Sequence, residues 1–243
     1  MVLPYIYYPE INLGFIKIYS FGLIVAIAFL AGLWFSLKEA KRRGVNRENV
    51  YSLVFYIIIG GIIGSRLLHI FLNWNVYSEN LLSIFMLWEG GLTFYGGFIG
   101  ALIAGFAYSR SKKLKFLKYV DILAPSIALG HAIGRIACIV GDGGHVGKLT
   151  SLPFGVIVNG ELRHLTALYS FVNLVFLFGL LLYLRKKKFF TGFLFLFYIC
   201  YYALTRFFIE LLRTDPTIYG LTATQWIAIP LFFISLGVII KKW

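Results

Sequence analysis

Arg135 lies in an apolar stretch, residues 120–140, where a charged side chain is unexpected. A guanidinium at membrane depth costs roughly 2.5–3.5 kcal/mol on insertion scales, so an arginine kept there usually faces a cavity and has a function. Arginine also keeps its proton at physiological pH, and its planar fork matches the oxygens of a phosphate. The sequence therefore predicts that Arg135 binds an anion.

The other charged residues in or beside apolar stretches are few, and the basic ones outnumber the acidic ones. They are Arg66, His69, Asp121, His131, Arg206 and Glu210, followed by Asp142, His145, Arg163, His164 and Arg213 near the ends of the stretches. Such a surplus of positive charge suits a lipid phosphate. Arg206 and Glu210 are four residues apart, which predicts an ion pair on one helical face. Arg213 is placed either to reach the membrane surface or to join the anion site.

Two glycine-rich segments accompany these charges. Arg66 follows the small-residue run 60–65, which favours close approach of another helix, so this arginine is either a packing charge or part of the anion site. The segment 88–97 reads Trp-Glu-Gly-Gly-Leu-Thr-Phe-Tyr-Gly-Gly. Its paired glycines favour close packing or amide groups directed at an anion, which makes Gly96 and Gly97 candidate substrate-binding residues.

The elements that must position these residues are apolar helices. The chain of 243 residues is 60% hydrophobic and 14% charged, with a mean hydropathy of +0.83, whereas soluble domains carry about 25% charged residues. This composition predicts an all-α polytopic membrane protein, with one transmembrane domain over residues 1–243. Seven spans of about 20 residues are expected, at residues 18–37, 50–73, 91–108, 119–139, 166–184, 190–212 and 222–240. The connection at about 141–165 is long enough for a small cap or lid.

The net charge of +13 is distributed as a topology signal. Basic residues cluster in 38–47, 110–118, 185–188 and 241–242, after the first, third, fifth and seventh spans. The positive-inside rule then predicts an outer N-terminus and a cytoplasmic C-terminus in the cytoplasmic membrane, with the connection at 141–165 outside. The clusters are expected to meet anionic lipid head groups, and no nucleic-acid partner is expected.

Taken together, the chain resembles the prolipoprotein diacylglyceryl transferase family. The matching segments occur in the family's order: 22–23, 64–66, 88–94 with 96–97, 134–135, 152–155, 163–164 with 168–169, 206–213, and 225 with 229–230. The resemblance implies a reaction at the outer face of the cytoplasmic membrane that needs no cofactor and no metal. In it, a diacylglyceryl group moves from phosphatidylglycerol to the lipobox cysteine of a preprolipoprotein, and glycerol phosphate is released.

The residues fit this chemistry, because positioned arginines can hold the phosphodiester and stabilise its departing charge. By position, Arg135 and Arg213 match the family's two phosphate-handling arginines, whereas Arg206 and Glu210 match a supporting pair. A thiol with an ordinary pKa near 8.5 must also be activated by a base or a positive field.

The chain departs from the family at the expected base, because Tyr95 stands where a histidine is common. Phe21 replaces a tyrosine, and Ala137-Cys138-Ile139 replaces a Gly-Asn-Phe run. Three substitutes for the base are His131, Asp142 and His145, and Tyr95 could instead hold the phosphate by a hydrogen bond. His131 could also be a neutral packing histidine bonded to a backbone carbonyl.

Two other functions are compatible with the sequence. A relative could keep the fold and the anionic-lipid site but use another donor or acceptor. A membrane anion transporter is the second alternative, but no inverted halves of similar hydropathy are evident, and the charges lie toward one side of the bilayer.

Overall fold

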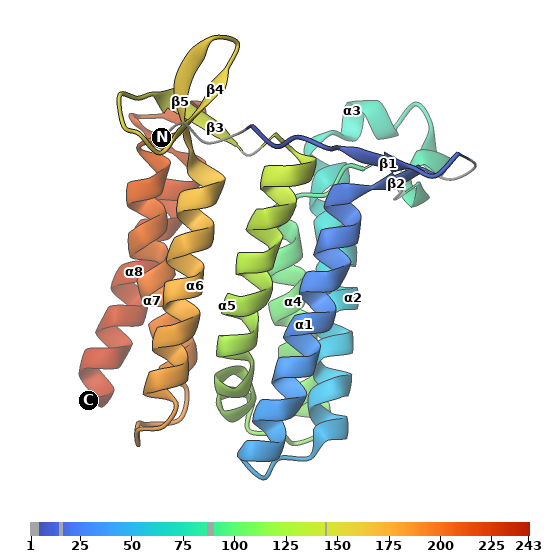
Figure 1. Cartoon of the computed structure of the whole chain (residues 1–243). Coiled ribbons are helices and arrows are strands. Elements are labelled where there is room, and N and C mark those ends of the chain that lie inside the picture. Colours follow the sequence, from blue (N-terminus) through green and yellow to red (C-terminus); the bar gives the residue numbers. More distant parts are fainter. Residues whose placement is uncertain (1–4, 15–16, 87–89, 144) are drawn as a thin grey trace. The chain divides into compact units, whose positions relative to one another are not determined.

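The computed structural model describes residues 5–14, 17–86, 90–143 and 145–243, coloured along the chain in Figure 1. The described chain forms two compact units. Unit 1 contains Met1–Ser36 and Val120–Trp243, and unit 2 contains Leu37–Tyr119. Both boundaries between the units fall inside long helices, one in α1 and one in α5.

Seven long helices carry most of the described chain. They are α1 (Ser20–Arg42), α2 (Arg47–Leu72), α4 (Phe94–Ser111), α5 (Phe116–Gly141), α6 (Thr166–Leu184), α7 (Phe193–Glu210) and α8 (Ala223–Lys242). Six of them are long and apolar enough to cross a membrane, and α4, with 18 residues, matches the third expected span. The prediction of an all-α, multi-pass membrane protein is confirmed. The expected boundaries of α1 were too early, because that helix continues through its basic end to Arg42.

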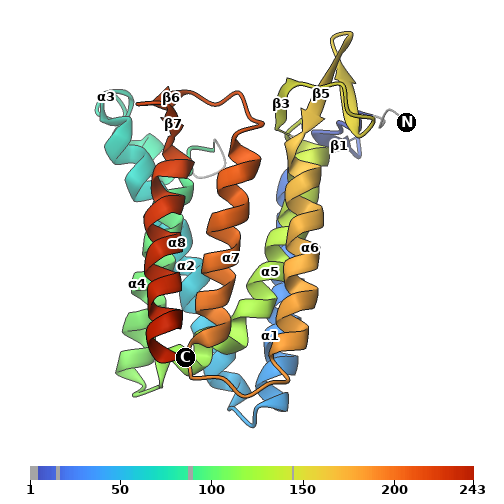
Figure 2. The same cartoon turned by 90° about the vertical axis from the view of Figure 1, so that its left-hand side faces the viewer.

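Short antiparallel strands join the helices of unit 1, and the sequence analysis did not predict them. They are β1 (Glu10–Asn12) with β2 (Lys17–Tyr19), β3 (Val146–Leu149), β4 (Gly155–Val158) and β5 (Glu161–Leu165) in the order β3-β5-β4, and β6 (Thr217–Ile218) with β7 (Leu221–Thr222). The three-stranded sheet occupies the connection that was expected to form a cap. Within unit 1, the strands gather at one end, and the C-terminus and the α6–α7 connection lie at the other (Figures 1 and 2).

The core of unit 1 lies between α5, α6 and α7. Leucines at 174, 177 and 181 form a fully buried stripe on α6, and alanines at 124, 128 and 132 face the same core from α5. Small residues let helix backbones approach closely in lipid, where packing rather than release of water drives association. Aromatic side chains of α7, among them Phe193 and Tyr198, complete this core.

Asp121, near the start of α5, caps the first turn of α7. Its carboxylate accepts hydrogen bonds from the backbone N–H groups of Gly192 (2.6 Å) and Phe195 (3.0 Å). The first N–H groups of a helix have no partner within the helix, and the positive end of the helix dipole favours a carboxylate there. This contact joins α5 and α7 at the end of unit 1 away from the strands.

Unit 2 is built on close packing of α2 against α4, with the short helices α3 (Trp74–Tyr77) and η1 (Leu81–Phe85) between them in the chain. A Cβ atom added at Gly64 would lie 2.4 Å from the carbonyl oxygen of Gly96, and one at Gly60 would lie 2.7 Å from that of Gly100. These positions therefore accept only glycine at this helix separation. The small-residue face predicted from the run 60–65 is the contact surface between the two helices.

Candidate functional site

The site begins with Arg135, which α5 positions within unit 1. Its Nη2 lies 3.2 Å from Nε2 of His131, one helical turn earlier. Nδ1 of His131 lies 3.1 Å from the hydroxyl of Tyr198 on α7, and its ring packs on that of Tyr202 with 4.8 Å between centroids. Both ring nitrogens of His131 are thus engaged by side chains, rather than by the backbone carbonyl considered in the sequence analysis.

A second arginine, Arg206, forms the ion pair that its spacing predicts. Its Nη2 lies 2.6 Å from Oε2 of Glu210, one turn later on α7. Glu210 is buried, accepts a hydrogen bond from the hydroxyl of Thr222 (3.1 Å), and lies 3.8 Å from Nε of Arg213. One carboxylate therefore serves two guanidinium groups.

Arg213, just after α7, has a carboxylate partner of its own. Its Nε donates to Oδ2 of Asp215 (2.5 Å) and its Nη2 to Oδ1 (3.2 Å), which is a two-point pairing. The hydrogen bonds from Arg213 hold the pKa of the Asp215 carboxyl below its ordinary value, although partial burial opposes them. Asp215 is not among the residues that the sequence singled out, although its place two residues after Arg213 indicated a possible ion pair.

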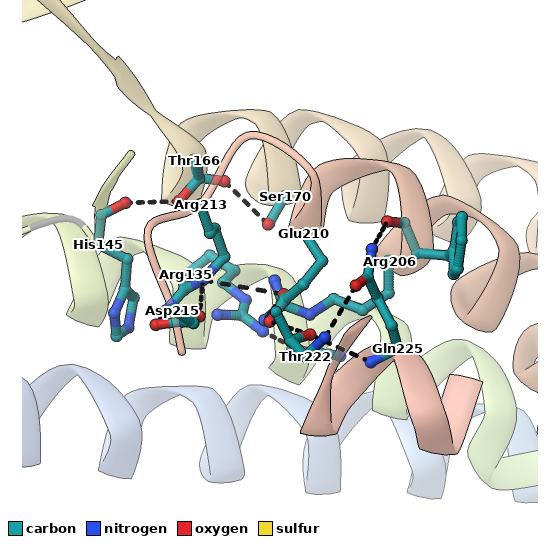
Figure 3. A network of polar contacts seen from close by, with 12 residues as sticks. Arg135, His145, Thr166, Ser170, Arg206, Glu210, Arg213, Asp215, Thr222 and Gln225 are labelled. Carbon is teal, nitrogen blue, oxygen red and sulfur yellow. Dashed lines mark hydrogen bonds and ion pairs between the residues drawn. The ribbon is translucent and has the colours of Figure 1, made fainter. Parts of the chain in front are cut away.

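Arg135, Arg206 and Arg213, with Glu210 and Asp215, form what we call the arginine cluster (Figure 3). Arg135 and Arg213 both interact electrostatically with Arg206. Three guanidinium groups thus face two carboxylates, and among the described residues Arg135 has no ion pair with any carboxylate. The cluster keeps one positive charge in excess, equal and opposite to that of one phosphodiester.

Two guanidinium nitrogens in the cluster are buried without a hydrogen-bond partner in the described part of the chain. They are Nε of Arg135 and Nη1 of Arg206. A buried, charged donor left without an acceptor is costly, so its presence calls for an acceptor from outside the chain. The oxygens of an anion would supply one.

Thr222 and Gln225 hold the start of α8 against the cluster. The Thr222 hydroxyl accepts from the Gln225 N–H, and the Gln225 side chain accepts from the Thr222 N–H, which is a capping box. Gln225 also donates to the carbonyl of Phe207 on α7 (3.3 Å). The Thr-x-x-Gln spacing was a readable signal for this helix start.

His145 and Asp142 lie where α5 gives way to β3. The two side chains approach to 3.6 Å between Nε2 and Oδ2, and the hydroxyl of Thr166 on α6 donates to the His145 carbonyl. Burial, reinforced by Arg213, lowers the pKa of His145 below its ordinary 6.5, and Asp142 opposes this effect. The ring is therefore neutral at neutral pH. Figure 3 shows His145 beside Arg213 and Asp215.

Arg66 belongs to unit 2, and its side chain is occupied by the backbone. Its Nε, Nη1 and Nη2 donate to the carbonyls of residues 83, 84, 86, 90 and 91. All three nitrogens are bonded and the side chain is buried. Of the two roles that the sequence left open, packing charge or part of the anion site, the geometry favours the packing charge. The carbonyls of Gly90 and Gly91 accept hydrogen bonds from the Arg66 guanidinium. The sequence had instead suggested that the amides of such paired glycines donate to an anion.

The remaining glycine motif also has a packing explanation. A Cβ at Gly96 would lie 2.3 Å from the Gly64 carbonyl oxygen, and one at Gly97 would lie 3.3 Å from that of Gly61. Tyr95 is half-buried in the first turn of α4. Trp88 and Glu89 of the same motif lie outside the described residues.

Comparison with known proteins identifies the scaffold that carries this cluster. The family model described as "Prolipoprotein diacylglyceryl transferase" matches residues 10–241. The chain belongs to the prolipoprotein diacylglyceryl transferase family. A relative named phosphatidylglycerol–prolipoprotein diacylglyceryl transferase from Geobacillus kaustophilus is 37% identical over 96% of this chain and 91% of its own length. Relatives of the same name are 36% identical in Clostridioides difficile (84% and 82% covered) and 34% identical in Listeria innocua (96% and 88% covered).

Some of the residues that differ from the transferase family pattern lie next to the arginine cluster. Cys138 is buried one helical turn beyond Arg135 on α5, in place of the asparagine in the family's usual run. Phe21 lies at the start of α1, where a Cβ added at Gly141 would meet its backbone nitrogen at 2.6 Å. The backbone and Cβ of Phe21 therefore make the close contact between α1 and the end of α5.

Proposed function

We propose that this chain transfers a diacylglyceryl group from phosphatidylglycerol to the lipobox cysteine of a preprolipoprotein, at the outer face of the cytoplasmic membrane. The full-length match to the family and the names of its relatives support the two substrates. The multi-pass helices put the site within reach of a membrane lipid. The basic clusters follow alternate spans, which supports this orientation by the positive-inside rule.

We assign the lipid phosphate to Arg135 and Arg206. The observation that carries this assignment is the pair of buried, unpartnered nitrogens, Nε of Arg135 and Nη1 of Arg206. Arg213 is already paired at two points with Asp215, so the geometry favours Arg206 over Arg213 as the second phosphate arginine. Arg213 then fixes Glu210 and Asp215, and through them the orientation of Arg206.

In the proposed reaction, the acceptor sulfur attacks the lipid's glyceryl carbon that carries the phosphate oxygen. A C–S bond forms, the C–O bond breaks, and its electron pair leaves with glycerol phosphate. The thiol proton passes to a base and then to water. Charge grows on the leaving phosphate as the bond breaks, so donors already held in place stabilise the transition state more than the bound substrate.

Tyr95 is proposed to contribute to phosphatidylglycerol binding, in place of the histidine common in the family. Its position in the family's Gly-Gly motif supports this role. A Tyr95→Phe substitution removes only the hydroxyl, and it should raise KM for phosphatidylglycerol several-fold. An unchanged KM would contradict the role.

One reconstitution tests the proposed function. Purified protein is mixed with phosphatidylglycerol vesicles and a synthetic peptide that carries the lipobox cysteine, and the peptide is weighed by mass spectrometry. We expect an adduct with the mass of a diacylglyceryl group on the thiol, and none with an otherwise identical Cys→Ser peptide. Vesicles of phosphatidylethanolamine provide the donor control. Absence of the adduct under conditions where a listerial relative produces it would refute the proposal.

A further inference from the structure

His145 is a histidine beside the arginine cluster with one ring nitrogen open. Its Nε2 faces Asp142 at 3.6 Å, and Nδ1 has no hydrogen-bond partner in the described part of the chain. The side chain is 30% exposed, so a substrate group arriving from outside can reach it. His131, by contrast, has both nitrogens engaged, by Arg135 and Tyr198.

The backbone holds this ring in place against a conformational cost. His145 has a φ of +47°, in the left-handed region that non-glycine residues seldom adopt. The Thr166 hydroxyl binds its carbonyl at 2.5 Å, and the next residue, Val146, pairs with Leu165 of β5. Such conformations are unfavourable for a non-glycine residue and persist where neighbouring contacts impose them. The sheet and α6 therefore fix the backbone position from which the imidazole projects.

The charges around His145 suit a proton acceptor. Arg213, Arg135 and Arg206 act on it from the cluster, and Asp142 acts on it from the end of α5. The cluster, together with burial, favours the neutral imidazole, whereas Asp142 favours the imidazolium once a proton has been taken. A neutral ring that a carboxylate stabilises after protonation is the usual arrangement of a general base.

We propose that His145, oriented by Asp142, is the catalytic base that takes the proton from the acceptor thiol. This inference rests on the proposed transferase function. In the reaction, Nδ1 accepts the thiol proton while sulfur forms its bond to the glyceryl carbon. The electron pair of the broken C–O bond leaves with glycerol phosphate, and the imidazolium then releases its proton to water. This chain thus carries an imidazole base although Tyr95 stands at the family's usual histidine position.

The test is the pH dependence of kcat/KM for adduct formation by the wild type and His145→Gln. The wild-type rate should fall on acidification only well below pH 6.5, because burial and the arginine cluster lower the pKa of His145 and it is protonated only there. His145→Gln should lose about 10²–10⁴-fold at pH 7, the usual contribution of a general base. That loss should shrink about 30-fold by pH 9.5, because a thiol of pKa near 8.5 goes from about 3% to about 90% thiolate.

His164→Gln is the matched control, because this histidine is buried on β5 and bonded to Tyr169. Any loss that it causes should be the same at every pH. Asp142→Asn should move the acid limb of the wild-type profile to lower pH, since Asp142 raises the pKa of His145.

A His145→Gln loss that is constant across the pH range, or no loss, would overturn the proposal while the wild type still forms the adduct. Failure of the wild type itself would instead refute the transferase function. The two results are therefore separate.

Discussion

Lysine substitutions provide the sharpest test of the arginine cluster. Arg135→Lys and Arg206→Lys keep the positive charge but replace a fork of donors with a single ammonium group. In each case the nitrogen that lacks a partner, Nε of Arg135 or Nη1 of Arg206, is lost. Arg213→Lys loses donors that are already satisfied by Asp215. The three substitutions are chemically identical, so differences among them report the position of the anion.

The expected magnitude follows from the number of donors facing the departing phosphate. Loss of one preorganised donor costs about 2.7–4 kcal/mol, or 10²–10³-fold in kcat. We therefore expect about 10²-fold loss for Arg135→Lys and Arg206→Lys. Arg213→Lys should lose no more than about tenfold, or 1.4 kcal/mol, because its effect passes through the Glu210 and Asp215 side chains. The sequence resemblance alone predicts the reverse order for Arg206 and Arg213.

The assay is the initial rate of adduct formation at saturating peptide, with phosphatidylglycerol varied in vesicles. Equal yields of monodisperse protein and equal melting temperatures in detergent show that each variant is folded. If Arg213→Lys is as damaging as Arg135→Lys while Arg206→Lys is mild, the assignment from unpartnered donors is refuted. Normal rates for Arg135→Lys would remove the phosphate clamp altogether.

Three further predictions concern stability and pH. Gly64→Ala should lower the melting temperature in detergent, because overpacking of this kind costs about 1–3 kcal/mol. Gly61→Ala is the control and should be neutral, because a Cβ there would lie 3.6 Å from the nearest atom, the carbonyl oxygen of Gly97. Equal effects of the two substitutions would contradict the packing account. Arg66→Lys should also lower the melting temperature, because the carbonyls of residues 83, 84, 86, 90 and 91 lose donors. An unchanged melting temperature would contradict its packing role. The pKa of Asp215 is lower in the folded protein than its ordinary 3.8, so the ionised carboxylate stabilises the fold above pH 3.8. That stabilisation is lost as the pH falls through the pKa of the folded state. On acidification below pH 4, the melting temperature of Asp215→Asn should therefore fall less than that of the wild type, and an equal fall would refute this.

The sequence predicted the helices well, because spans in lipid must be long, apolar and internally hydrogen-bonded. Length and hydropathy alone were enough to place all seven. The ion pair of Arg206 with Glu210 followed from helical spacing. The close approach at Gly60 and Gly64 followed from residue size.

The partners of each charge were harder to predict. Whether Arg66 binds a carbonyl or a phosphate depends on where residues 83–86 and 90–91 lie, and no periodicity in the sequence encodes their positions. The pairing of Arg213 with Asp215 and the strands of the connection 141–165 are likewise set by loop geometry. The strands are only two to five residues long, too short to show an alternating pattern.

The cap that Asp121 places on α7 has a geometric consequence for the site. The two helices start from this shared contact, and they run in the same direction. Ten residues beyond Asp121 and Gly192, the rings of His131 and Tyr202 meet at 4.8 Å. Fourteen residues beyond the same contact stand Arg135 and Arg206, each about 21 Å along its helix at 1.5 Å per residue.

Equal counts from one origin therefore place Arg135 and Arg206 at the same level along the α5–α7 pair. A single-residue deletion in either helix would offset them by about 1.5 Å and turn one by about 100°. The connections that follow α5 and α7 lie beyond the counted segments, so changes in their length need not move either arginine.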